Sequence, residues 1–137
     1  MEMMPILGDL TNEQFESLLK ICTKKVFPIF TVIFREGDQS EEMYILTDGV
    51  LKVTLRGKEI SRILPMSTVG EMCIFTGKIS SATVTTISKC TLLRIMKNDL
   101  FALFEKDKDF HIKFLNVMIL DLANKVRISN EVIANLK

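Results

Sequence analysis

The chain of 137 residues contains 18 basic and 17 acidic residues, which leaves a formal net charge of +1. This balance excludes the positive field by which nucleic-acid-binding and polybasic membrane-binding proteins attract their partners, so we expect neither kind of partner. The length and a hydrophobic content of 47% predict a single domain over residues 1–137 that buries a core of its own without disulfides.

The first predicted element is an N-terminal helical segment within residues 1–25. Thr11, followed three residues later by Gln14, predicts a capping box in which each side chain satisfies a free backbone amide at the helix start. Apolar residues then recur at the spacing of one helix face, namely Phe15, Leu18, Leu19 and Cys22.

Residues 26–96 change to short strands separated by turns. The runs Asp48-Gly49 and Arg56-Gly57-Lys58 predict two of these turns. In the run LKVTLR (51–56), apolar and polar side chains alternate, which is typical of a strand with one buried face. Many short strands at this spacing predict a mainly β fold with flanking helices: a barrel, a jelly roll or a sandwich.

Residues 97–137 are predicted to form two helices. Asn98 or Asp99 is expected to cap a short helix, and a long helix is expected from about Phe110. Steps of three and four along the long helix form a heptad seam, and β-branched residues at its a positions favour a parallel two-stranded coiled coil. We therefore expect a homodimer through this helix; the alternative is a helix folded wholly onto its own core. The seam consists of Ile112, Leu115, Ile119, Leu122, Val126, Ser129, Ile133 and Leu136.

Two motifs and the helix that follows them carry a resemblance to a known family. The stretch FREGDQSEEMYILTDGVLKVTL (34–55) has a strand, a Glu-Gly-Asp turn, a Tyr-Ile-Leu strand, a glycine turn and an apolar strand. The stretch GEMCIFTGKISSATV (70–84) has the length of a phosphate-binding cassette, with Gly70, Glu71 and the run 82–84 in place. The chain thus resembles the cyclic-nucleotide-binding domain of the catabolite activator and cAMP-regulated kinase family. This resemblance implies a β-roll (a small jelly roll) between an N-terminal helical segment and a long C-terminal helix.

The resemblance also implies roles for individual residues. Glu71 is expected to accept a hydrogen bond from a ribose 2′-hydroxyl, and Gly70 to let the backbone approach the ligand. Met72 and Cys73 are expected to begin a helical turn whose amides face the phosphate. Hydroxyl donors in the same loop are Ser80, Ser81 and Thr83, and candidates for contacting the base are Asn124, Lys125 and Arg127. The alternative is that Gly70 only makes a turn and that Glu71 is a solvated surface acid.

The resemblance implies a cassette arginine that pairs with the cyclic phosphate; aligned without gaps, that position here is Ser80. A hydrogen bond to a charged group contributes about 1.5–3 kcal/mol, and stranding a buried charge costs about 3–5 kcal/mol. At about 1.4 kcal/mol per decade, the affinity for the phosphate should fall by roughly one to three and a half decades. Lys78 in the same loop could supply a charge, but its ammonium lacks the planar fork of a guanidinium.

These observations predict a regulatory or sensor domain that binds cAMP or cGMP weakly or in an altered mode. Ligand binding would then be coupled to the long helix, and the response would pass to an unidentified protein partner or a further domain. The alternative is a dimerisation or scaffold module whose pocket is vestigial. Ser80 favours the alternative, whereas Gly70 and Glu71 favour binding.

Catalytic and metal-dependent functions are not expected. The chain has one histidine, His111, whereas a cupin-type metal site and a Ser-His-Asp or Cys-His arrangement all need a suitably placed histidine inside the β structure. We expect no cofactor. Groove-reading DNA-binding elements are also not evident. The first ten residues lack the basic region of a signal peptide, and the widely spaced Cys22, Cys73 and Cys90 predict reduced thiols in a cytoplasmic protein.

Overall fold

The computed structural model describes residues 9–135, except for the side chains at positions 128–130, 132 and 133. In chain order its elements are α1 (Asn12–Ile21), β1 (Cys22–Phe27), β2 (Val32–Phe34), β3 (Glu42–Asp48), β4 (Leu51–Leu55), β5 (Lys58–Ile63), β6 (Ser67–Val69), α2 (Glu71–Thr76), β7 (Thr83–Thr86), β8 (Cys90–Met96), α3 (Lys97–Lys106) and α4 (Lys108–Asn135). No helix among the described residues is both long and apolar enough to cross a membrane.

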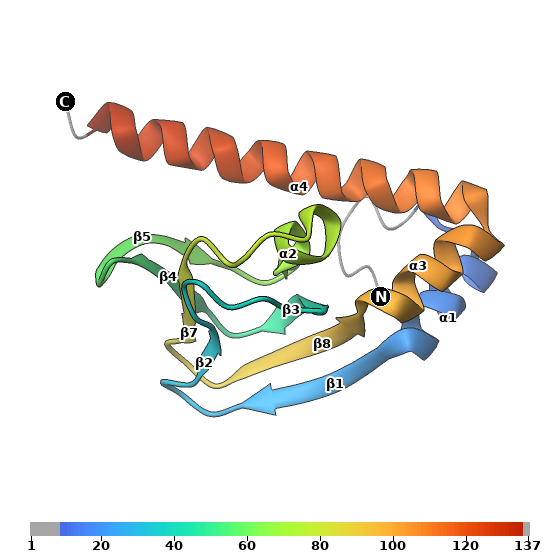
Figure 1. Cartoon of the computed structure of the whole chain (residues 1–137), viewed down its shortest axis with the longest axis horizontal. Coiled ribbons are helices and arrows are strands. Elements are labelled where there is room, and N and C mark those ends of the chain that lie inside the picture. The colour runs from blue at the N-terminus through green and yellow to red at the C-terminus, as the bar shows by residue number, and fades with distance from the viewer. Residues whose placement is uncertain (1–8, 136–137) are drawn as a thin grey trace.

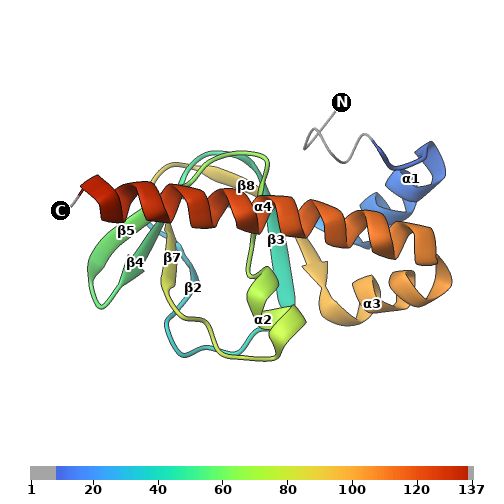
Figure 2. The same cartoon turned by 90° about the horizontal axis from the view of Figure 1, so that it is seen from above.

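The strands form two four-stranded antiparallel sheets, in the orders β1-β8-β3-β6 and β2-β7-β4-β5. α1 and α3 lie together at one end of this roll, and α4 runs across it, past α2 and over β4 and β5 (Figures 1 and 2). The predicted mainly β fold, a β-roll with an N-terminal helix and a long C-terminal helix, is confirmed.

The boundary between the first helix and the strands differs from the prediction. The capping box at Thr11 and Gln14 is confirmed by two reciprocal hydrogen bonds of 2.9 and 3.1 Å. The helix nevertheless ends at Ile21, and β1 begins at Cys22, inside the segment predicted to be helical. All six residues of β1 pair with β8, from Cys22 opposite Ile95 to Phe27 opposite Cys90. Pairing with a strand far along the chain, which local patterns do not show, sets this boundary.

The start of the C-terminal helices also differs. α3 begins at Lys97 after Met96, without a side-chain cap, so the prediction that Asn98 or Asp99 caps this helix is wrong. The reason is that β8 runs directly into α3, and the Lys97 amide donates instead to the Glu41 carbonyl at 2.8 Å. The start of α4 has a side-chain partner, since Asp107 Oδ1 accepts from the Phe110 amide at 3.0 Å.

Two apolar clusters build the core. The first lies between the helices and the sheet of β3 and β8, and α4 contributes to it its buried residues Phe110, Phe114, Val117 and Met118. The second lies inside the roll and contains Phe34, Tyr44, Leu46, Leu51, Val69, Val84, Cys90 and Leu92. The first half of α4 is thereby anchored to its own domain, as its apolar content predicts.

The opposite face of α4 is exposed within the single chain. Of the predicted seam, Ile112 and Ile119 are each 62% exposed and Val126 is 59% exposed, while Leu115 and Leu122 are half-buried. Leu136 and the side chains of Ser129 and Ile133 lie outside the described part of the chain. The seam therefore lies where a second helix can reach it, and its role in dimerisation stays a prediction.

Candidate functional site

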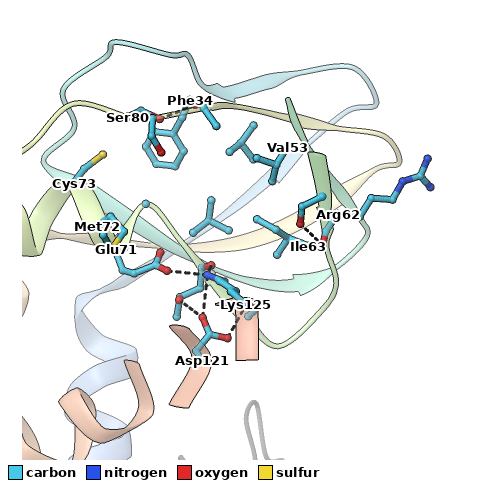
Figure 3. A pocket seen from close by; sticks show the side chains of 18 of the residues that line it. Phe34, Val53, Arg62, Ile63, Glu71, Met72, Cys73, Ser80, Asp121 and Lys125 are labelled. Carbon is cyan, nitrogen blue, oxygen red and sulfur yellow. Dashed lines mark hydrogen bonds and ion pairs between the residues drawn. The ribbon is translucent and has the colours of Figure 1, made fainter. Parts of the chain in front are cut away.

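A cavity of about 660 Å³ lies between the roll and α4. Its walls come from β2, from β4 to β7, from α2 with the loop that follows it, and from the middle of α4 (Figure 3). One wall is apolar and includes Phe34, Val53 and Ile63. The predicted site residues that line the cavity are Gly70, Glu71, Met72, Cys73, Lys78, Ser80, Ser81, Asn124 and Lys125. Residues distant in sequence are thus brought together largely as the sequence predicts.

Gly70 joins β6 to α2 in a backbone conformation that requires glycine. Its φ of +83° lies in the left-handed region, and a Cβ at this position would lie 2.5 Å from Cζ of Phe34. Because no side chain fills this space, Phe34 packs against the backbone where α2 begins. The predicted helical turn at Met72 and Cys73 is present as α2, Glu71–Thr76.

Glu71 is buried at the cavity wall, with 4% of its surface exposed. The alternative of a solvated surface acid is therefore wrong for this residue. Its Oε1 accepts a hydrogen bond from Lys125 Nζ at 2.8 Å (Figure 3). The ammonium of Lys125 also lies 3.0 Å from Asp121 Oδ2 and donates to the Thr68 carbonyl at 2.7 Å. A lysine ammonium has three donors; here two of them have hydrogen-bond acceptors, and Asp121 lies at ion-pair distance.

Asp121 completes this network and was not predicted from the sequence. Its Oδ1 accepts from the Ser67 hydroxyl at 3.0 Å, and its Oδ2 accepts from the Thr68 hydroxyl at 2.7 Å. The sequence contains one signal for it, because an acid four residues before Lys125 is the favourable order for an ion pair on a helix. The partners on β6 could not be inferred, since β6 itself was not predicted. The network binds the middle of α4 to β6 and α2.

Ser80 lies in the loop between α2 and β7. Its amide donates to the Asp38 carbonyl at 2.7 Å, and its carbonyl accepts from the Gly37 amide at 2.9 Å. The Ser80 hydroxyl donates to the Ala82 carbonyl at 2.6 Å. The Glu-Gly-Asp turn thus fixes the loop through backbone bonds, while the side chain at position 80 supplies no positive charge. Lys78 lies on the exposed part of the loop and lines the cavity.

Two predicted contact residues do not line the cavity. Thr83 and Val84 point to opposite sides of β7, as successive strand residues do; Val84 lines the cavity, whereas the Thr83 hydroxyl accepts from the Glu36 amide at 3.1 Å. Arg127 is exposed, and its guanidinium donates to the side-chain oxygen of Asn124. Thr83 and Arg127 therefore lie outside the cavity lining in this arrangement of the chain, and their predicted contacts with a ligand stay predictions.

Cys73 is a buried thiol on the cavity wall. Burial, together with the negative charge of Glu71, raises the pKa of Cys73 above its usual value. A raised pKa keeps the group in the unreactive thiol form at neutral pH. Cys73 therefore acts as an apolar wall residue.

Among the described residues, no group of three or more His, Cys, Asp and Glu side chains is arranged to hold a metal ion.

Comparison with known proteins supports the likeness of fold and of sequence. The model of the cyclic nucleotide-binding domain matches residues 24–107. A cGMP-dependent protein kinase of Drosophila melanogaster is 32% identical over 87 residues, which are 64% of this chain and 8% of the kinase. The chain therefore spans a small part of that relative.

Among solved structures, a cyclic nucleotide-binding domain from Methylobacillus flagellatus superimposes with a TM-score of 0.91 at 18% identity, over 98% of this chain and 82% of that chain. The catabolite activator protein of Thermus thermophilus superimposes with a TM-score of 0.75 at 20% identity, over 96% of this chain and 62% of that chain. At these identities the two structures establish the shared fold.

Proposed function

The chain belongs to the cyclic nucleotide-binding domain family, and from this membership we propose that it is a non-catalytic regulatory domain that binds cAMP or cGMP in the cavity beneath α4. Binding is weak or altered in mode, because Ser80 stands where the family's cassette has an arginine. The class of ligand, a cyclic nucleotide, is taken from the matching family model and from the names of similar proteins.

The observation that carries this proposal is the buried carboxylate of Glu71 at the wall of a cavity of about 660 Å³. A buried carboxylate facing a cavity is a strong hydrogen-bond acceptor for a ligand hydroxyl. The apolar wall with Phe34 and Val53 is suited to a planar base or a sugar ring. Gly70, which has no side chain, lets the backbone at the start of α2 approach the ligand.

The phosphate end is the weak part of the proposed site. The loop after α2, which contains Ser80, lies at this end of the cavity. The side-chain cation in this loop is Lys78, which is exposed. Lys78 can approach a phosphate only by ordering a flexible side chain, which costs conformational entropy. We therefore expect affinities well below those of a cassette with an arginine.

Calorimetric titration with cAMP and with cGMP tests the proposal, using the wild type, Ser80→Arg and Asn98→Arg. Asn98 is exposed on α3 and does not line the cavity, so Asn98→Arg adds the same charge elsewhere and controls for nonspecific attraction. We expect weak binding by the wild type and an affinity at least about tenfold higher, about 1.4 kcal/mol, for Ser80→Arg. If neither nucleotide binds to the wild type, to Ser80→Arg or to Ser80→Arg/Lys125→Met, which also frees Glu71, the proposal is wrong.

Signal transfer would pass through α4, which contributes Asp121, Asn124 and Lys125 to the cavity wall. A ligand that binds two arrangements of α4 with different affinities would shift the population between them. We propose that the chain acts as a homodimer through the seam on the exposed face of α4, and that an unidentified protein partner reads the arrangement of the two helices.

A second candidate function is a dimerisation or scaffold module that binds no nucleotide. The contact between Glu71 and Lys125 favours it, because the expected ligand acceptor already has a partner. Replacing Leu122 and Val126 together by glutamate should give monomers in sedimentation, whereas Glu131→Lys, away from the seam, should not. If the glutamate variant sediments as the wild type does, α4 is not the dimer interface.

A further inference from the structure

The contact between Lys125 and Glu71 joins the middle of α4 to the part of the cavity that is expected to hold the ligand. The 2.8 Å bond spans 54 positions of the sequence. Among the described residues, Lys125 is the hydrogen-bond donor that the structure places on the Glu71 carboxylate. Figure 3 shows the ammonium between Glu71 and Asp121 at the edge of the cavity.

Burial makes this contact different from an ordinary surface ion pair. The side chains of Glu71 and Asp121 are 5% and 9% exposed, whereas that of Lys125 is 31% exposed. The lysine therefore neutralises two carboxylates that have little access to water. Removing a cation from buried carboxylates is unfavourable unless another donor replaces it.

α4 contains a second pair of an acid and a lysine, and in this pair the acid is exposed. Lys113 also lies four residues after an acid, at 2.9 Å from Asp109 Oδ2, but that carboxylate is 63% exposed. Lys113 lies outside the cavity. The two lysines thus share the helix, the spacing and the charge, and they differ in whether the acid they pair with is buried at the cavity.

We propose that Lys125 is an internal ligand of the cavity, which holds Oε1 of Glu71 and competes with a ligand hydroxyl for this carboxylate. This inference rests on the proposed function, because it concerns the regulation of the same site. Displacement removes one of the bonds that tether α4 to α2, and it weakens the Thr68 contact to β6. A bound ligand therefore releases the second half of α4, and the tether lowers the apparent affinity for any ligand that needs Glu71.

The test compares Lys125→Met with Lys113→Met by calorimetry against cAMP and cGMP. Methionine keeps an unbranched side chain of similar length and removes the ammonium. We expect Lys125→Met to bind about tenfold more tightly than the wild type, about 1.4 kcal/mol, and Lys113→Met to bind as the wild type does. The double variant Asp121→Asn/Lys125→Met removes the second buried charge; its amide oxygen can accept from one of the hydroxyls of Ser67 and Thr68, and its NH2 group can donate to the other. It serves if the single variant does not fold.

Hydrogen exchange of the α4 amides gives a readout that needs no ligand. We expect exchange to be faster around positions 118–127 in Lys125→Met, and not in Lys113→Met. The tether is then measured directly, whatever the nucleotide affinity is.

The possible outcomes separate the two proposals. If the wild type binds a nucleotide and Lys125→Met binds it no more tightly, the internal ligand is wrong while the proposed function stands. If no variant binds, including Ser80→Arg/Lys125→Met, the proposed function is wrong and the exchange experiment alone decides. Faster exchange in Lys125→Met then supports the tether, and unchanged exchange overturns it.

Discussion

Replacing Gly70 by alanine should destabilise the domain more than the same change at Gly77, at the other end of α2. Both glycines have a positive φ, +83° and +71°, so both alanines are strained by roughly 1–2 kcal/mol. At Gly77 nothing lies within 4 Å of the added Cβ. At Gly70 the Cβ would lie 2.5 Å from Phe34 Cζ and 2.9 Å from Phe34 Cε2.

Phe34 has little room to move away. It is 6% exposed, and its ring packs edge-on against Tyr44 at a centroid distance of 5.7 Å. Overpacking of this kind costs about 1–3 kcal/mol, so Gly70→Ala should lose about 2–5 kcal/mol in total when the backbone strain is included. Gly77→Ala should lose only the strain.

Urea unfolding followed by far-ultraviolet circular dichroism measures both losses, since the chain has no tryptophan and one tyrosine. With a urea dependence of about 2 kcal/mol/M, the midpoint should fall by about 1–2.5 M for Gly70→Ala and by about 0.5–1 M for Gly77→Ala. Equal losses would refute the argument, because they would mean that Phe34 does not press on position 70.

Three further predictions concern other parts of the structure. Hydrogen bonds from Gln14 and Lys113 hold the pKa of Asp109 below its usual 3.8; this stabilisation is present at neutral pH and is lost as the pH falls below about 4, so the melting temperature of Asp109→Asn should fall less on acidification than that of the wild type. Burial raises the pKa of Cys22 to about 11; alkylation of native protein at pH 8, followed by mass spectrometry, should therefore be much slower than in urea. Phe110 is fully buried, and Phe110→Ala should lower the free energy of unfolding by about 3–5 kcal/mol in urea titrations.

Much of the fold could be predicted because it depends on local patterns. Alternating apolar residues in LKVTLR, glycines at turns and the capping box at Thr11 each report a backbone preference that acts over a few residues. β6 escaped prediction because a three-residue edge strand carries almost no periodic signal. β1 was placed too late because its first residues continue the helical pattern, and only pairing with β8 makes them a strand.

The sequence by itself indicated a mainly β fold with flanking helices, a likeness to a phosphate-binding cassette at Gly70 and Glu71, and a heptad pattern along the last helix. Only the tertiary structure decided that Glu71 is buried and already bound by Lys125, that Asp121 supports this contact, and that Thr83 and Arg127 lie outside the cavity. The physical reason is distance along the chain. A helix or turn is stabilised by neighbours a few residues away, whereas the Lys125 contact joins groups 54 positions apart and exists only after α4 has packed across the roll.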